Sequence, residues 1–263
     1  MRAALLQIAV RPDEPAGERR ARVAALVREQ RGADLVLLPE LWTCGAFAFD
    51  AFRAHAEPLT GPTARAMGEA AAAAQVWLHA GSIVELGPGD VLFNTSLLFA
   101  PDGRLHRTYR KIHRFGFDSG EAALMAPGDE IVTAGLPLAP AGLATCYDLR
   151  FPEQFRQLTD AGAELLLVTA GWPAARRAHW SLLTRARAVE SQAYLLACCT
   201  AGTHAGVEQA GHSVVVDPWG EVVAEAGAGE ETLVADLDPA LVAKTRAGFP
   251  VLRDRVLGLP LPR

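Results

Sequence analysis

Three side chains able to do acid–base or nucleophilic chemistry lie where predicted strands of the sequence end. Glu40 follows the run DLVLLP, Lys111 follows LHRTYR, and Cys146 follows GLAT. In open α/β sheets, polar residues at strand ends line the crevice that binds ligands. Each residue taken singly also fits a structural role: a helix cap or ion-pair partner, a solvated charge, and a small core residue. Their common position makes them candidates for one site.

Cys146 has the setting of a nucleophile. It lies between a predicted strand and a helix predicted to begin at Pro152, in the run ATCYDLRFPE. A strand-to-helix elbow presents a nucleophile, and a nearby helix N-terminus with a cationic neighbour lowers the pKa of a thiol. Cys44, Cys198 and Cys199 lack this setting. The last two are adjacent within an apolar run, so we expect structural roles for both.

Lysine is rare in this chain. Only Lys111 and Lys244 are lysines among its 25 basic residues, and the others are arginine. A lysine that persists where arginine supplies most of the charge is a candidate for chemistry that a guanidinium cannot do.

The segments that position these residues alternate between strands and helices. Strands are predicted at residues 3–10, 34–38, 76–85, 91–100, 105–109, 142–146, 164–169, 194–200, 212–216, 221–224 and 232–236, and helices at 16–31, 62–74, 152–161 and 175–192. Mixed strands with paired helices indicate a layered α/β sandwich. Both halves run strand–helix–strand–helix, which suggests an internal pseudo-two-fold arrangement. With 263 residues, we expect a single domain over 1–263.

Composition excludes several classes of function. The net charge is −5 without a block of like charge, which argues against binding nucleic acid or an anionic membrane surface. No apolar run reaches the ~18 residues of a membrane span, and the N-terminus lacks the features of a signal peptide. The cysteines have neither disulfide-framework nor zinc spacing. We therefore expect a soluble cytoplasmic protein without a metal or other cofactor.

Three blocks of the sequence resemble the signature blocks of the carbon–nitrogen hydrolases, the nitrilase superfamily. They span residues 37–42, 109–113 and 145–153, in the order and at intervals typical of that family. Two later stretches, 179–190 and 211–220, resemble its long helix and its late hairpin. The resemblance covers nearly the whole chain. It implies the αββα nitrilase-like sandwich, whose family members usually assemble as homodimers or larger homo-oligomers.

The resemblance also implies a role for each candidate. Glu40 would be the general base, and Cys146 would attack an amide carbon to form a thioester, releasing ammonia or an amine. Lys111 would stabilise the oxyanion together with the backbone N–H of Tyr147. A second glutamate of the family aligns with Glu121, whose role would be to position the substrate or Lys111.

The run CYDLRFPE resembles the branch of amidases that act on ω-amides of 2-oxo acids or on deaminated glutathione. The expected substrate is thus a small amide that carries a carboxylate. Arg150 and Trp172 are candidates to contact it with Tyr147, although Arg150 could equally pair with Asp148 or Glu153. N-carbamoyl hydrolases and nitrilases share the same trio and remain alternatives.

Two rival classes compete with this interpretation. A Cys–His–Asp acyl transferase or protease would need a histidine base, and His113 stands close to Lys111 in the sequence. We expect His113 to be a structural or supporting residue, because a carboxylate is the base in the resembling family. A catalytically silent scaffold protein would be favoured by loss of any member of the trio, and none is lost.

Overall fold

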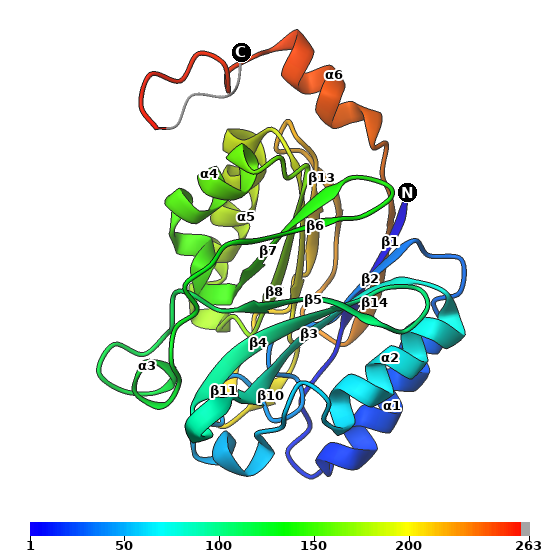
Figure 1. Cartoon of the computed structure of the whole chain (residues 1–263), viewed down its shortest axis with the longest axis vertical. Helices are drawn as coiled ribbons and strands as arrows, with labels where there is room; N and C mark the ends of the chain where they lie inside the picture. Colours follow the sequence, from blue (N-terminus) through cyan, green and yellow to red (C-terminus); the bar gives the residue numbers. More distant parts are fainter. Residues whose placement is uncertain (259–263) are drawn as a thin grey trace.

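Two six-stranded mixed sheets packed face to face form the centre of the computed structural model, which describes residues 1–258 (Figure 1). The first sheet has the order β14 (Glu231–Asp236), β1 (Arg2–Gln7), β2 (Leu35–Leu37), β3 (Trp77–Leu86), β4 (Leu92–Phe99) and β5 (Leu105–Arg110). The second has the order β13 (Val222–Glu225), β12 (Val214–Val216), β9 (Tyr194–Cys199), β8 (Leu165–Ala170), β7 (Pro140–Thr145) and β6 (Val132–Gly135).

Paired helices cover the outer face of each sheet. The helices α1 (Ala16–Arg28) and α2 (Pro62–Ala74) lie on the first sheet, and α4 (Pro152–Asp160) and α5 (Arg177–Ser191) lie on the second (Figure 1). In each sheet three consecutive strands are parallel, β1–β2–β3 and β7–β8–β9, because helical crossovers connect them. The expected αββα sandwich and its pseudo-two-fold arrangement of halves are confirmed.

The apolar character of the parallel strands follows from burial on both faces. In β2, Leu35 and Leu37 face the layer between the sheets. Val36 and Leu38 face the helices α1 and α2. Successive side chains of a strand point to opposite faces, so a strand buried on both sides is apolar throughout.

Several short elements were not predicted from the sequence. They are β6, the hairpin β10 (Thr203–His204) with β11 (Val207–Glu208), the single-turn helix α3 (Glu121–Leu124), and α6 (Ala240–Gly248). The helix α6 lies beyond one end of the sandwich (Figure 1). Except for α6, these elements are too short for a hydrophobic period to develop. Within residues 1–258, no helix is long and apolar enough to cross a membrane.

Candidate active site

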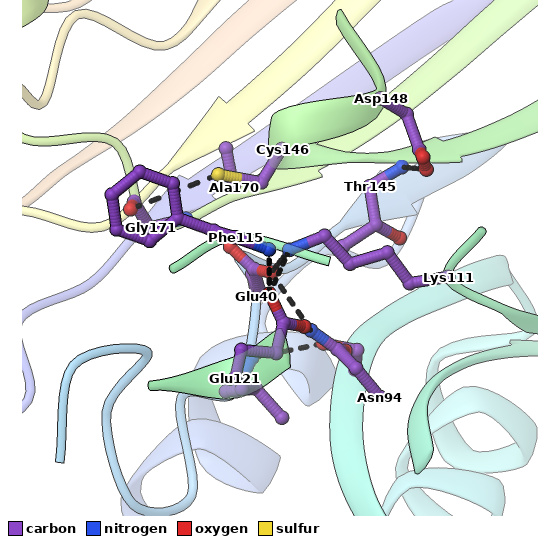
Figure 2. A network of polar contacts seen from close by, with 12 residues as sticks. Glu40, Asn94, Lys111, Phe115, Glu121, Thr145, Cys146, Asp148, Ala170 and Gly171 are labelled. Atoms are coloured by element: carbon purple, nitrogen blue, oxygen red, sulfur yellow. Dashed lines mark hydrogen bonds and ion pairs between the residues drawn. The ribbon is translucent and has the colours of Figure 1, made fainter. Parts of the chain in front are cut away.

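A buried ring of four polar side chains lies at one edge of the two sheets. Lys111 Nζ donates to Glu40 Oε1 and to Glu121 Oε2, both at 2.8 Å. Asn94 Nδ2 donates to Glu40 Oε1 and to Glu121 Oε1, again at 2.8 Å. All four side chains are buried, and Figure 2 shows Lys111 and Asn94 converging on the two glutamates. The ring brings together three of the four predicted catalytic residues and adds Asn94, which the sequence analysis missed.

Glu40 connects the two sheets. It follows β2 and Pro39, and the next residue, Leu41, has the positive φ of 43°. The backbone N–H of Leu41 is held by Ser82 Oγ at 3.0 Å. The second carboxylate oxygen of Glu40 accepts the backbone N–H of Gly171 at 2.8 Å, and Gly171 follows β8 of the other sheet. The carboxylate is therefore fixed from both sides of the sandwich.

Lys111 and Glu121 come from the segment after β5. The backbone N–H of Lys111 donates to Asn94 O at 2.8 Å, which continues the β4–β5 ladder by one residue. Glu121 is the first residue of α3, and its Oε2 also accepts the backbone N–H of Phe115 at 2.8 Å. Glu121 thus closes the loop that follows Lys111, which places Phe115 in the pocket wall.

Cys146 stands on a tight turn between β7 and the 3₁₀ helix η4 (Cys146–Arg150). Its φ is 47°, a left-handed conformation that costs an ordinary residue about 1–2 kcal/mol. The turn is held because the backbone N–H of Thr145 donates to Asp148 Oδ2 at 2.8 Å. The thiol lies 3.8 Å from Gly171 O. This is the strained strand-to-helix elbow that exposes a nucleophile.

The thiol of Cys146 does not have the lowered pKa that the sequence context suggested. Burial raises its pKa well above the usual value, the charge of Glu40 raises it further, and Lys111 opposes both. That expectation was wrong because the thiol is buried, and the charge of Glu40 affects its pKa more than the charge of Lys111 does. The resting group is a protonated thiol, so a base is required to form the thiolate.

Burial and neighbouring charges also shift the pKa values of Lys111 and Glu121. Burial alone would lower the pKa of Lys111, but Glu121 and Glu40 raise it well above its ordinary value. Burial raises the pKa of Glu121, Lys111 lowers it, and the charge of Glu40 raises it again. Lys111 is therefore a permanent cation that faces two carboxylates.

A pocket of about 390 Å³ opens above the ring. All seven residues predicted for the site line it: Glu40, Lys111, Glu121, Cys146, Tyr147, Arg150 and Trp172. The remaining lining residues were not predicted: Ala46, Phe47, Phe49, Phe115, Gly171, Pro173 and Arg176. The floor is charged, and the walls are mostly aromatic.

Two arginines, Arg150 and Arg176, line this pocket. Arg150 lies over the ring of Trp172, with 4.7 Å from guanidinium carbon to ring centroid. Arg176 lies over Phe115 at 5.4 Å. The nearest polar partner of Arg150 is Nδ1 of His179 at 3.3 Å. In the described part of the chain Arg150 pairs with neither Asp148 nor Glu153, the two structural partners considered for it.

His113 lies outside the pocket and serves the elbow. Its Nδ1 and its backbone N–H both contact Asp148 Oδ1, at 2.8 and 3.0 Å, and its ring stacks on Phe151 at 3.7 Å. Asp148 also accepts the hydroxyl of Tyr109 at 2.7 Å. The carboxylate whose charge raises the pKa of the Cys146 thiol is instead Glu40. This arrangement disfavours a Cys–His pair.

The long helix α5 supports the elbow from outside. Arg187 is buried and donates to Leu149 O at 3.0 Å. It also pairs with Glu190 at 2.7 Å. Within residues 1–258, no group of three or more His, Cys, Asp or Glu side chains is placed to hold a metal ion.

Comparisons with known proteins agree on one family. The model of the carbon–nitrogen hydrolase family matches residues 2–247. The 2-oxoglutaramate amidase of Paenarthrobacter nicotinovorans is 41% identical over 259 residues, which cover 96% of this chain and 88% of that protein. The crystal structure of Saccharomyces cerevisiae Nit3, from branch 10 of the nitrilase superfamily, is 32% identical and has a TM-score of 0.88, covering 98% of this chain and 97% of that one.

A third relative bears on the cysteine. A structure of the amidase from Nesterenkonia sp. AN1 shows acrylamide added to its active-site cysteine. It is 26% identical with a TM-score of 0.76, and covers 95% of this chain and 98% of that one.

The enclosed thiol leads to a prediction about Glu40→Gln. Because the charge of Glu40 raises the pKa of Cys146, its removal should make the thiol more acidic. The far-ultraviolet absorbance of the thiolate should appear at lower pH in the variant than in the wild type. The signal of Cys146 is isolated by subtracting the same titration of Cys146→Ala in each background. An unchanged or higher titration pH would contradict the electrostatic account of the site.

Proposed function

This chain belongs to the carbon–nitrogen hydrolase family, and we propose that its substrate is a small primary amide whose far end carries a carboxylate. The chain is an amidase that cleaves a carbon–nitrogen bond other than a peptide bond through a cysteine. One observation carries the substrate proposal. The guanidinium groups of Arg150 and Arg176 line the same pocket as the thiol of Cys146.

In the proposed acylation step, Glu40 takes the proton of the Cys146 thiol and the sulfur attacks the amide carbon. The carbonyl electrons move onto oxygen, and the resulting oxyanion is stabilised by Lys111 and the backbone N–H of Tyr147. That N–H lies in the first turn of η4, where helical N–H groups have no intrahelical acceptor. Glu40 then returns the proton to the amide nitrogen, the C–N bond breaks, and ammonia leaves a thioester.

The thioester is hydrolysed by the same groups. Glu40 takes a proton from a water molecule, and the hydroxide attacks the thioester carbon. The second oxyanion collapses, the C–S bond breaks, and the sulfur recovers the proton from Glu40. The sum is amide plus water to carboxylic acid plus ammonia.

Lys111 has the geometry for its proposed role. An ammonium has three N–H donors, and two of them are committed to Glu40 and Glu121. Among the described residues no third acceptor lies within hydrogen-bond distance of Lys111 Nζ. The remaining donor is available to the oxyanion that forms on the substrate when Cys146 attacks the amide carbon. Glu121 keeps the ammonium in this orientation.

The arginines support recognition of a carboxylate. A guanidinium binds a carboxylate bidentately, which fixes orientation as well as adding affinity. Arg150 stacks on Trp172 and lines the pocket without an acidic partner among the described residues, so no carboxylate of the protein competes with that of a substrate. Trp172 is itself fixed, since its Nε1 donates to Arg176 O at 2.8 Å. A relative named 2-oxoglutaramate amidase suggests an ω-amide of a 2-oxo dicarboxylic acid as the first compound to assay.

We also propose that the chain forms a homodimer or larger homo-oligomer in a reducing cytoplasm. Several large apolar side chains are exposed, among them Leu182 on α5 and the stacked pair Trp219 and Phe249. A second copy that covers them would remove this apolar surface from water. The free cysteines agree with a reducing compartment.

Replacing Lys111 by arginine tests the proposed oxyanion role. A planar guanidinium does not fit the site of a compact ammonium, so kcat of Lys111→Arg should fall roughly 10²–10³-fold, as for loss of one oxyanion donor. Lys111→Ala should be similarly impaired. The control is Lys244→Arg, because Lys244 forms an exposed pair with Asp238 and its change should leave kcat unaltered. If Lys111→Arg retains most of its kcat, Lys111 supplies charge only.

Replacing Arg150 by methionine tests the substrate class. The assay compares kcat/KM for a carboxylate-bearing amide with that for its neutral methyl ester. The wild type should prefer the carboxylate, and Arg150→Met should reduce that preference roughly 10–100-fold, as for loss of a hydrogen bond to a charged group. The exposed Arg177, outside the pocket, gives the control Arg177→Met, with an unchanged preference.

A preference near unity in the wild type, or one unchanged in Arg150→Met, would remove Arg150 from recognition. The same panel includes a carbamoyl compound and a nitrile. Faster turnover of either one would assign the chain to that class of substrate instead.

A further inference from the structure

Asn94 occupies a position that the chemistry described so far does not use. It lies in β4, is 1% exposed, and touches both glutamates of the ring through one nitrogen atom. Its backbone oxygen also accepts the N–H of Lys111. One residue therefore contacts the proposed base, the second glutamate and the lysine.

The orientation of the Asn94 amide follows from its neighbours. Both N–H groups of Nδ2 point to carboxylate oxygens at 2.8 Å. The reversed amide would place Oδ1 against two carboxylates, which is repulsive. Oδ1 has no partner within the described residues, so a buried acceptor is left unsatisfied at a cost. The orientation of the amide is therefore set by the two hydrogen bonds that Nδ2 donates.

Each glutamate accepts hydrogen bonds from neutral N–H groups as well as from Lys111, because one ammonium does not neutralise two carboxylates. Two buried carboxylates share the single ammonium of Lys111. Each carboxylate accepts three hydrogen bonds: one from Lys111, one from Asn94, and one backbone N–H, of Gly171 for Glu40 and of Phe115 for Glu121. A like-charged pair in a closed site tends to bind a proton. Donors such as Asn94 oppose that protonation.

We propose that Asn94 is a positioning residue that holds the carboxylates of Glu40 and Glu121 on either side of Lys111, so that Glu40 stays free to accept the thiol proton. This inference rests on the proposed function, because it assigns Asn94 to act through Glu40. It differs from a merely structural role in what its loss should change. Without the amide N–H groups, a proton should enter the glutamate pair at a higher pH.

A shift in the pH profile can be assigned to the glutamate pair, because the other titratable groups nearby do not change protonation state in the pH range of the assay. Burial raises the pKa of Glu121, and the hydrogen bond from Asn94 is among the interactions that lower it. Three more distant groups interact with Glu40. Burial raises the pKa of Cys44 and of Cys199 to about 12, and lowers that of His204 to about 4.

Two further titratable groups lie at the site: Lys111 of the ring, and Cys146 beside it. Burial lowers the pKa of Lys111, but the carboxylates raise it well above the ordinary value, and burial raises that of Cys146. These groups therefore keep one protonation state between about pH 5 and 8, where the activity is measured.

The test uses two variants of Asn94 in the full chain. Asn94→Leu keeps the branched outline of the side chain and removes both donors, and Asn94→Thr keeps one donor on a side chain suited to a strand. The acid limb of the kcat/KM profile should move upward by about one pH unit or more in Asn94→Leu. Asn94→Thr should show a smaller upward shift. At the wild-type optimum, kcat should fall more than KM rises.

A second readout does not depend on the natural substrate. The pH profile of the rate at which iodoacetamide alkylates Cys146, followed by mass spectrometry, should move to lower pH in Asn94→Leu, because a proton on the glutamate pair removes charge that raises the pKa of the thiol. If the wild type hydrolyses no amide, the proposed function fails, while alkylation still tests Asn94. The matched control is Thr95→Val on the opposite face of β4, where Thr95 donates to Glu85 at 2.5 Å. Its pH profiles should equal those of the wild type.

Each outcome decides the proposal. Upward shifts of the acid limb of kcat/KM in the order wild type, Asn94→Thr, Asn94→Leu, with alkylation moving to lower pH in the same order, support it. Reduced rates with an unmoved acid limb would overturn it, since they would describe a general loss of packing. If neither variant folds, as judged by circular dichroism, Asn94 serves the stability of β4 and the proposal is equally overturned.

Discussion

The structure of this amidase depends on one buried ammonium group between two carboxylates. Lys111 is 2% exposed, and removing a charged lysine from water costs several kcal/mol unless partners replace the lost hydration. Glu40 and Glu121 supply that replacement, but they leave the ring with one excess negative charge. The surrounding N–H groups then become necessary. The backbone at Gly171 and Phe115 and the amide of Asn94 all point inward for this reason.

The fold provides these groups because the site lies where both sheets end. Glu40 belongs to the first sheet, whereas Gly171 and Cys146 follow strands of the second. Two residues beside the reacting groups, Leu41 and Cys146, have φ values of 43° and 47°. Such conformations persist only where the surroundings over-determine them. The bond between Ser82 and Leu41 and the one between Asp148 and Thr145 do so here.

Much of the fold could be predicted from sequence because the strands are buried on two faces and the four long helices have clear periods. The candidates Glu40, Lys111 and Cys146 could be located because each follows a predicted strand. Asn94 gave no such signal. It lies inside a strand, among the polar residues Asn94, Thr95 and Ser96, and which face each side chain takes depends on the sheet partners. Arg176 was hidden because it lies in η5 (Ala174–Arg176), a single 3₁₀ turn between β8 and α5. The direction of the Cys146 pKa was predicted wrongly, because local sequence indicates a helix terminus but not the enclosure of the sulfur.

The central claim is that Cys146 carries the acyl group, while Glu40 acts as the base and Lys111 stabilises the oxyanion. Intact-mass spectrometry of the enzyme quenched in acid during turnover of a slow carboxylate-bearing amide tests this directly. The account predicts an added mass equal to the acyl fragment, mapped by peptide digestion to Cys146 and absent from Cys146→Ala. An adduct at another residue, or turnover well above trace level in Cys146→Ala, would contradict it.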